Sequence, residues 1–206
     1  TIVGCVGPMS GVYTIGGANA DYNNINDALI QLYNCSLDSH VVFNIASGTY
    51  SGQIEIHPIA GTTDTATVTF QSAALDSTTV ILTHNSNSVD NYTVYLNSAD
   101  WIQFKHLSIV ASNSSAGRAL VINNGATYNT FENCIIQAGP GTANTCVAIY
   151  SGDDLDNNNT FRRNRILDGY YGVYMEGESL SLLESGTVFE YNEIIGYHNT
   201  GFYYEY

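Results

Sequence analysis

The sequence predicts an all-β protein, a right-handed parallel β-helix of about seven coils of 26–30 residues each. This prediction depends on two ladders of apolar residues. In the first ladder a phenylalanine is followed five residues later by an isoleucine, in steps of 27, 30 and 28 residues; the phenylalanines are Phe104, Phe131, Phe161 and Phe189. The second ladder consists of short β-rich runs that start at positions 94, 120, 147, 173 and 202. Two short strands in every period exclude a helical repeat, and a β-sandwich would need no constant period, so stacked coils are favoured.

Residues 1–40 are predicted to form a Gly-rich lead-in and one short capping helix. The helical pattern covers residues 24–33, where Asn24 and Asp27 have the spacing of a capping-box variant. Its apolar stripe consists of Ile25, Ala28, Leu29 and Leu32. Because a solenoid leaves the apolar end of its first coil exposed, we expect this helix to cover that end.

Residues 41–206 are predicted to form the coils, and with the lead-in they make a single domain, 1–206. The second ladder extends backwards to runs at 68 and 42 and gives one inward column, made of Val42, Val68, Val94, Leu120, Val147, Val173 and Phe202. A second inward column, two residues further on, is made of Phe70, Leu96, Ile122, Ile149 and Met175. The outward positions between them read Tyr95, Val121, Ala148, Tyr174 and Tyr203. The sequence stops at Tyr206 inside an unfinished coil, so we expect further coils or domains beyond it.

Two polar columns accompany the apolar ladders. Asn164 and Asn192 occupy equivalent positions between the phenylalanine and the isoleucine, where stacked amides can bond each other and the turn backbone. The position after each phenylalanine alternates in charge and reads Lys105, Glu132, Arg162 and Glu190, while Arg165 faces Glu193 one coil away. Opposite charges on neighbouring strands favour the native register by about 0.2–1 kcal/mol per pair.

Composition argues against several classes of partner. The net charge is −14 and there are only five Lys and Arg residues, so nucleic acid and anionic membranes are repelled. No apolar run is long enough to insert into a bilayer. The four cysteines, Cys5, Cys35, Cys134 and Cys146, lack metal-site spacing. Cys134 reads as a buried thiol, whereas a Cys5–Cys35 bridge is one option that spacing does not establish.

Two acidic loops form a candidate Ca²⁺ site. Asp153, Asp154 and Asp156 lie in the loop 150–160, and Glu176, Glu178 and Glu184 lie in the equivalent loop of the next coil, 176–187. Neighbouring carboxylates supply the oxygen ligands that Ca²⁺ prefers, and the alternative is a solvated acidic surface. No catalytic residue is assigned, because a lyase needs a base and a cation near its substrate, whereas four of the five basic residues, all but Arg118, lie in the charge ladder or directly beside it. No other cofactor is predicted.

Tyrosines form the candidate ligand-binding surface. Tyr95, Tyr174 and Tyr203 are outward positions of successive coils, and Tyr170 and Tyr171 lie in a nearby turn. Tyrosine combines a flat apolar ring with a polar tip, which suits sugar rings and adhesion surfaces. The alternative is that tyrosine is simply favoured in β-strands.

Several segments resemble one known group of proteins. They are Val12-Tyr-Thr-Ile-Gly-Gly17, Val42-Phe-Asn-Ile-Ala-Ser-Gly-Thr-Tyr-Ser-Gly52, Val68-Thr-Phe-Gln-Ser72, Asn91-Tyr-Thr-Val-Tyr-Leu96, Leu155-Asp-Asn-Asn-Asn-Thr-Phe161 and Leu183-Glu-Ser-Gly186. Over nearly its whole length the chain looks like the right-handed β-helix, pectin-lyase-like repeat proteins of Bacteroidota that are exported by type IX secretion. The resemblance implies a secreted protein or one displayed on the cell surface. It implies no common catalytic signature.

Three functions remain open at this point. The first is a secreted or cell-surface protein that binds a polysaccharide or cell-surface glycan, or displays the solenoid for adhesion, without catalysis. The second is a carbohydrate-active enzyme, either a polysaccharide lyase or a glycoside hydrolase. The third is a rigid spacer between other domains. Binding to glycans, release of sugar products, or inertness in both assays would separate them.

Overall fold

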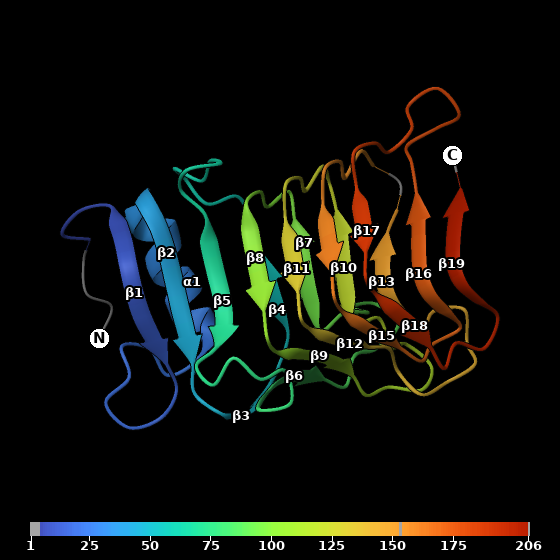
Figure 1. The fold of residues 1–206 in the computed structure, drawn as a ribbon, viewed down its shortest axis with the longest axis horizontal. Helices are drawn as coiled ribbons and strands as arrows, with labels where there is room; N and C mark the ends of the chain where they lie inside the picture. The colour runs from blue at the N-terminus through green and yellow to red at the C-terminus, as the bar shows by residue number, and fades with distance from the viewer. Residues whose placement is uncertain (1–4, 153, 206) are drawn as a thin grey trace.

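Three parallel β-sheets wind around one axis and form the solenoid, with the N-terminal end at the left of Figure 1. The computed structural model describes residues 5–152 and 154–205. Within these residues, neighbouring strands of each sheet pair in parallel and come from successive coils. The predicted right-handed parallel β-helix of about seven coils with one short helix is confirmed.

Each sheet is named here after the side chains that characterise it. The phenylalanine sheet contains β1 (Met9–Ile15), β2 (Leu37–Ile45), β5 (Val68–Ser72), β8 (Ile102–Lys105), β11 (Thr130–Glu132), β14 (Thr160–Arg162) and β17 (Val188–Glu190). The isoleucine sheet contains β3 (Gly48–Ser51), β6 (Val80–His84), β9 (Ser108–Ala111), β12 (Ile135–Gln137), β15 (Arg165–Leu167) and β18 (Glu193–Ile195). The tyrosine sheet contains β4 (Ile54–Ile56), β7 (Val94–Asn97), β10 (Leu120–Asn123), β13 (Val147–Ser151), β16 (Tyr171–Glu176) and β19 (Thr200–Glu205).

A continuous stack of phenylalanine rings runs through the core. The rings lie 4.5 to 5.5 Å apart between centroids, and the stack consists of Phe43, Phe70, Phe104, Phe131, Phe161 and Phe189. The first five are 0–1% exposed. Stacked aromatic pairs contribute about 0.5–1.5 kcal/mol beyond the burial of their area, so this stack fixes the coils in register.

The predicted inward columns are wrong in the first two coils. Val68 pairs with Val41 and Ile102, and Phe70 pairs with Phe43 and Phe104. Both residues therefore belong to the phenylalanine sheet. They do not lie beside Val94 and Leu96, as was predicted. Val42 is half-buried and points outward, and Ile56 pairs with Leu96 in the tyrosine sheet. The runs at 42 and 68 keep the spacing of 26 residues, although they lie in the phenylalanine sheet and the later runs lie in the tyrosine sheet. A constant spacing gives the length of a coil, and it does not show to which sheet a run belongs.

Further along the axis, between β10 and β13, the tyrosine sheet contains a shift of two residues. Leu120 pairs with Ile149 rather than with Val147, and Ile149 pairs with Val173. The outward residue of β13 is therefore Tyr150, whereas Ala148, which was predicted to face outward, is fully buried in the core. The shift adds an aromatic ring to the outer face of this sheet.

Helix α1 (Ile25–Cys35) lies where the capping helix was expected. The Asn24 side chain accepts a hydrogen bond from the Asp27 backbone N–H at 2.9 Å and so begins the helix. Its buried face, made of Ile25, Ala28, Leu29, Leu32 and Cys35, packs on β1 and β4. In the described part of the chain no helix is long and apolar enough to cross a membrane.

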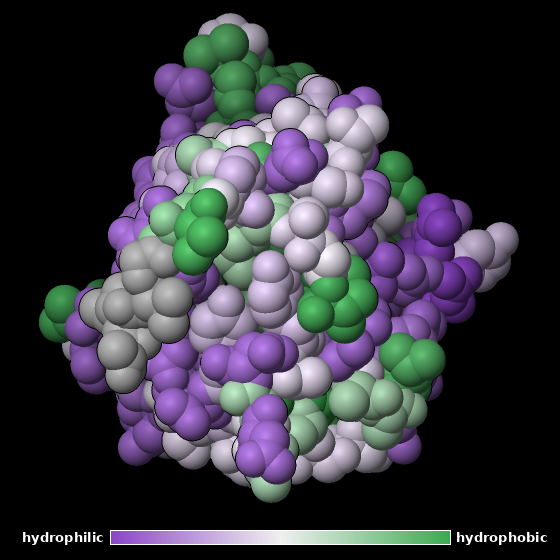
Figure 2. All heavy atoms as spheres, turned by 90° about the vertical axis from the view of Figure 1, so that its left-hand side faces the viewer, coloured by the Kyte–Doolittle hydropathy of each residue, from purple (hydrophilic) through white to green (hydrophobic). Residues whose placement is uncertain are grey.

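Side chains of α1 also occupy the hydrogen-bonding edge of β4. Asn26 donates to the Gln53 carbonyl at 3.3 Å, and the Tyr33 hydroxyl accepts from the His57 backbone N–H at 3.0 Å. An open strand edge is a template for pairing with other chains, so these bonds protect the first strand of the tyrosine sheet. Figure 2 views this end of the solenoid, where polar and pale residues dominate and the hydrophobic ones are scattered.

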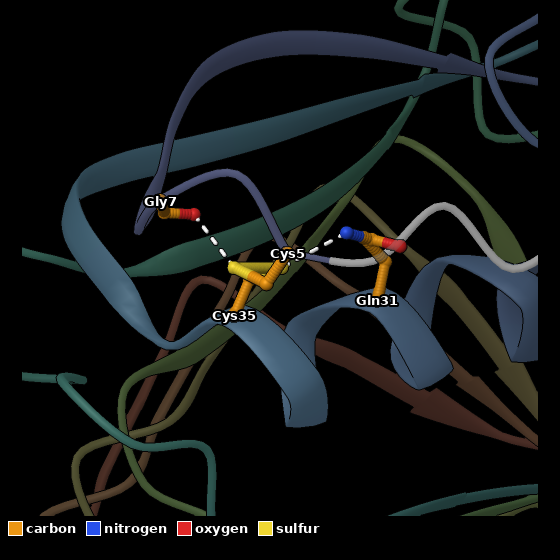
Figure 3. The surroundings of a disulfide bond; sticks show 4 residues. All are labelled: Cys5, Gly7, Gln31 and Cys35. Atoms are coloured by element: carbon orange, nitrogen blue, oxygen red, sulfur yellow. Dashed lines mark hydrogen bonds between the residues drawn. A yellow bond between two sulfur atoms is a disulfide. The ribbon is translucent and has the colours of Figure 1, made fainter.

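A disulfide joins Cys5 to Cys35 and ties the lead-in to the end of α1 (Figure 3). The Cα atoms of the two cysteines are 5.2 Å apart, and the Gln31 amide donates to the Cys35 sulfur at 2.9 Å. Cys134 and Cys146 are free and buried, as predicted for Cys134.

Asparagines stack at two corners of the coil. At the corner between the phenylalanine and isoleucine sheets, Asn164 accepts from the Cys134 N–H and donates to the Phe131 carbonyl, each at 2.9 Å. Asn192 makes the same two bonds one coil later, to Asn164 and Phe161, which confirms the predicted stacking. A second ladder, Asn129 and Asn159, lies at the corner between the tyrosine and phenylalanine sheets and was not predicted.

The predicted charge ladder lies on the outside of the phenylalanine and isoleucine sheets. Lys105 approaches Glu132 at 3.9 Å, and the guanidinium of Arg165 contacts Glu193 at 2.9 Å. Arg162 pairs with Glu190, and Arg163 pairs with Glu132. Four of the five basic residues are thus partnered away from the tyrosine sheet.

Candidate functional site

The outer face of the tyrosine sheet carries one outward residue per coil in direct register. Along the axis these residues are Glu55, Tyr95, Val121, Tyr150, Tyr174 and Tyr203. We call the four tyrosines of this set the tyrosine row. Neighbouring strands lie about 4.8 Å apart, so the side chains of the row are evenly spaced along the axis. They are held by β-strands rather than by loops. Two of its members, Tyr174 and Tyr203, were predicted correctly as neighbours, and Tyr150 was missed because of the shift in β13.

The rings of the row stack on one another at the C-terminal end. Ring centroids are 5.3 Å apart for Tyr150 and Tyr174 and 5.1 Å apart for Tyr174 and Tyr203. Tyr171 packs against both Tyr174 and Tyr203, and Tyr170 meets Tyr171 edge to face at 4.8 Å. Four of the five predicted tyrosines are therefore brought together. Stacking covers ring faces, so the row presents mainly ring edges and hydroxyl groups.

Tyr95, the fifth predicted tyrosine, lies apart from this group because Val121 separates it from Tyr150. It contacts Tyr92 instead, with ring centroids 5.3 Å apart. Its hydroxyl accepts a hydrogen bond from the Asn124 side chain at 2.7 Å. The candidate site therefore has two parts, a Tyr92–Tyr95 pair towards the N-terminal end and a larger cluster towards the C-terminal end.

Carboxylates accompany the tyrosines along the face. The Tyr174 hydroxyl donates to Glu176 at 2.9 Å, and the Tyr203 hydroxyl donates to Glu205 at 2.9 Å. Burial, and then the hydrogen bond to Glu176, raises the pKa of Tyr174. At the other end, Glu55 accepts from the Asn97 side chain at 2.8 Å and from the Tyr92 hydroxyl at 3.3 Å. Burial and the nearby Glu55 raise the pKa of Tyr92 to about 12.

One cation lies on the face. The guanidinium carbon of Arg118 is 3.4 Å from the centroid of the Tyr150 ring, within the range of a cation–π interaction. Arg118 precedes β10 in the loop 112–119, and Tyr150 belongs to β13, so the contact joins two successive coils. From the sequence, Arg118 is the one basic residue not assigned to the charge ladder. Its contact with Tyr150 was not predicted, because the register of Tyr150 was not predicted.

Three of the predicted acidic loop residues make separate contacts or face solvent. Asp154 accepts from the Asn124 backbone N–H at 3.2 Å, Glu176 is bonded to Tyr174, and Glu178 is exposed. Asp153 lies outside the described residues. Within residues 5–152 and 154–205 no group of three or more His, Cys, Asp or Glu side chains could hold a metal ion. Ca²⁺ binding at these loops stays a prediction.

Asp156 and Glu184 meet instead at a buried serine. The Ser151 hydroxyl is 2.9 Å from Asp156 Oδ2 and 2.6 Å from Glu184 Oε1, while Asp156 Oδ1 accepts from the Ala126 N–H at 2.9 Å. Asp156 is 0% exposed and Glu184 is 8% exposed. Ser151 occupies an inward position of β13, in register with Ile122 and Met175. From the sequence, both acids were expected in loops, as Ca²⁺ ligands or on a solvated surface. The sequence does not reveal that Ser151 lies in the inward column of Ile122 and Met175.

The protons in this cluster can be counted. A serine hydroxyl has one hydrogen and can donate to one carboxylate only, so its second short contact requires a protonated carboxyl group. Burial raises the pKa of Glu184 to about 7 and the pKa of Asp156 to about 6, which agrees with a shared proton. Among the described residues, Glu184 Oε2 has no hydrogen-bond partner.

Comparison with known proteins identifies the fold. No protein-family model and no curated protein matches the sequence. The structure is similar to crystal structures of the pectin methylesterase from Aspergillus niger. The deglycosylated form is 20% identical with a TM-score of 0.50, over 99% of this chain and 87% of the other. The penultimately deglycosylated form is 18% identical with a TM-score of 0.50, over 96% and 85% of the two chains.

A rhamnogalacturonan lyase is 11% identical with a TM-score of 0.47, over 94% of this chain and 62% of the other. The two pectin methylesterase structures, at 20% and 18% identity, reveal a shared fold and leave activity undetermined. The protein is therefore a right-handed parallel β-helix. Its chemistry has to be argued from its own side chains.

Proposed function

We propose that this protein is secreted or displayed on the cell surface and binds a glycan along the outer face of the tyrosine sheet without cleaving it. The observation that carries this proposal is the tyrosine row, in which Tyr150, Tyr174 and Tyr203 stack in register on three successive strands. Aromatic side chains with polar tips, fixed on a rigid scaffold, lose little conformational entropy when a ligand binds.

The surroundings of the row support a linear ligand. All strands of the sheet are parallel, so the loops that precede them line one side of the face and the loops that follow them line the other. The loop after β16, residues 177–187, stands out at the upper right of Figure 1. An extended polymer running along the solenoid axis would meet one tyrosine in each of the last three coils.

Two features support binding without turnover. Asp156 and Glu184, a pair of carboxyl groups joined by a single hydroxyl, are buried and turned toward Ser151, so a substrate bond does not reach between them. Of the cations that could act as a base or neutralise a carboxylate, four are paired on other faces, and the guanidinium of Arg118 lies on Tyr150. A carboxylate beside a cation keeps that cation protonated, which makes it a poor base.

The test measures binding of acidic, neutral and amino polysaccharides by affinity electrophoresis. We expect Tyr174→Ala to weaken binding at least tenfold, about 1.4 kcal/mol, because Tyr174 lies between two other rings of the row. The matched control is Tyr191→Ala, since Tyr191 is 81% exposed at a different corner of the coil.

Equal loss of binding in the Tyr174→Ala and Tyr191→Ala variants would show that the row is not the site. The bound polysaccharides are also incubated with the protein and assayed for new reducing ends and for unsaturated products. Steady release of either product would contradict binding without cleavage.

A further inference from the structure

We infer that the glycan bound by the tyrosine row carries protonated amino groups, rather than being neutral or built from uronic acids. This inference rests on the function proposed above and specifies its ligand. The features that lead to it are the hydrogen-bond donors and acceptors on the face, the position of Arg118, and the distribution of charge over the molecule.

Three tyrosine hydroxyls of the face already donate their hydrogens to carboxylates. A tyrosine hydroxyl has a single hydrogen, and those of Tyr174, Tyr203 and Tyr92 are donated to Glu176, Glu205 and Glu55. What each of these pairs offers to a ligand is an oxygen lone pair on the phenol and the remaining lone pairs of a carboxylate. These three pairs are therefore rich in acceptors and poor in donors.

An ammonium group matches this arrangement, because it has three donors and no acceptor. A uronate carboxylate has only acceptors and would lie against Glu176 and Glu205, so its approach is unfavourable. A neutral sugar hydroxyl both donates and accepts, and half of its capacity would find no partner. Hydrogen bonds between an ammonium group and a carboxylate are about twice as strong as bonds between neutral groups.

The face already holds one cation that belongs to the protein. Arg118 places its guanidinium 3.4 Å from the centre of the Tyr150 ring, beside the tyrosines that are paired with carboxylates. This contact shows that a positive group is accommodated at the row. A ligand cation at the next coils would meet Tyr174 with Glu176 and Tyr203 with Glu205.

The charge of the whole molecule favours the same ligand. The net charge is −14, and Lys105, Arg162, Arg163 and Arg165 are paired with glutamates on the other two sheets. A field of one sign attracts polymers of the opposite sign and raises the rate of encounter. Pairs of tyrosine and glutamate repeat on neighbouring strands about 4.8 Å apart, which suits a polymer with regularly spaced amino groups.

The experiment compares four probes by calorimetry in a mildly acidic buffer that keeps amino groups protonated. The probes are an oligomer of β-1,4-linked glucosamine, its fully N-acetylated counterpart, an oligogalacturonate and an oligolysine. We expect the glucosamine oligomer to bind at least tenfold more tightly than each of the other three. The double variant Glu176→Gln with Glu205→Gln should lose this preference, and Glu178→Gln with Glu193→Gln, which removes the same charge elsewhere, should keep it. Thermal melting confirms that each variant is folded.

The outcomes separate the inference from the proposed function. If the acetylated oligomer or the oligogalacturonate binds as tightly as the glucosamine oligomer, and Tyr174→Ala abolishes that binding, the glycan function stands and the inference is overturned. If none of the three glycans binds, both fail. If the oligolysine binds as tightly as the glucosamine oligomer and also depends on Glu176 and Glu205, the face recognises basic peptides and the inference fails.

Discussion

Replacing Glu184 with glutamine should stabilise the protein at alkaline pH and leave it unchanged at acidic pH. Glu184 and Asp156 share the hydroxyl of Ser151 in a buried site. Burial raises the pKa of Glu184 from 4.5 to about 7. The folded protein thus holds this proton more tightly than the unfolded chain does. The stabilisation is fully present below the unfolded pKa, near 4.5, and is lost as pH rises through the folded pKa, near 7.

The size of the effect follows from the two pKa values. One pKa unit corresponds to about 1.4 kcal/mol, so the rise in the pKa of Glu184 gives an upper bound of about 3 kcal/mol on the loss of stability. Some access of solvent to Glu184 reduces the penalty of the charged form, and we expect about 2 kcal/mol. Glutamine has nearly the same shape and no charge, so Glu184→Gln should remove this loss.

The assay is urea unfolding of the wild type and the variant at about pH 4 and about pH 8, which lie below the unfolded pKa and above the folded pKa of Glu184. The two proteins should have equal free energies of unfolding at the lower pH, and the variant should be more stable by about 2 kcal/mol at the higher pH. General repulsion among the acidic residues also changes with pH, so Glu178→Gln, an exposed site in the same loop, serves as the control. If Glu184→Gln gains no more than Glu178→Gln at the higher pH, the protonated carboxyl is not present.

Three further predictions concern stability. Asn164→Leu removes the partners of the Cys134 N–H and the Phe131 carbonyl and should cost about 1–3 kcal/mol for each group, so an unchanged melting temperature would contradict the ladder. Reducing the disulfide between Cys5 and Cys35 should lower the free energy of unfolding by about 2–4 kcal/mol, and Cys5→Ser should show the same loss without a reductant. Millimolar Ca²⁺ should raise the melting temperature, and Asp153→Asn with Asp154→Asn should abolish the rise; no heat of binding in calorimetry would dispose of the site.

The fold could be predicted from the sequence because each coil repeats the same inward side chains. Phe104, Phe131 and Phe161 are equivalent in sequence and stacked in space, and each is followed five residues later by an isoleucine. The same spacing could not reveal the sheet to which the first two coils belong. The run at 68 has the same spacing as the later runs because differences in loop length cancel. In the structure, Phe70 of this run pairs with Phe43, whereas Leu96 pairs with Ile56.

The site was less accessible to prediction because it depends on register and burial. A shift of two residues in β13 decided that Tyr150, and not Ala148, meets Tyr174. Asp156 and Glu184 looked like solvated acids, since the sequence does not show that Ser151 replaces an apolar residue in the core. Contacts between residues that are about thirty positions apart, such as that of Ser151 with Glu184, are set by the path of each loop.

The corner between the phenylalanine and isoleucine sheets has a consequence for how such a protein can diversify. In the four coils from β8 onward, His106, Asn133, Arg163 and Tyr191 at this corner all adopt a left-handed backbone with φ of 53° to 56°, and the spacing from phenylalanine to isoleucine stays at five residues. In these four coils, differences in length are therefore confined to the loops on either side of the tyrosine sheet. Mutations can change the length or the charge of those loops without disturbing the phenylalanine stack. Relatives with the same coils can therefore differ in the ligands that they prefer.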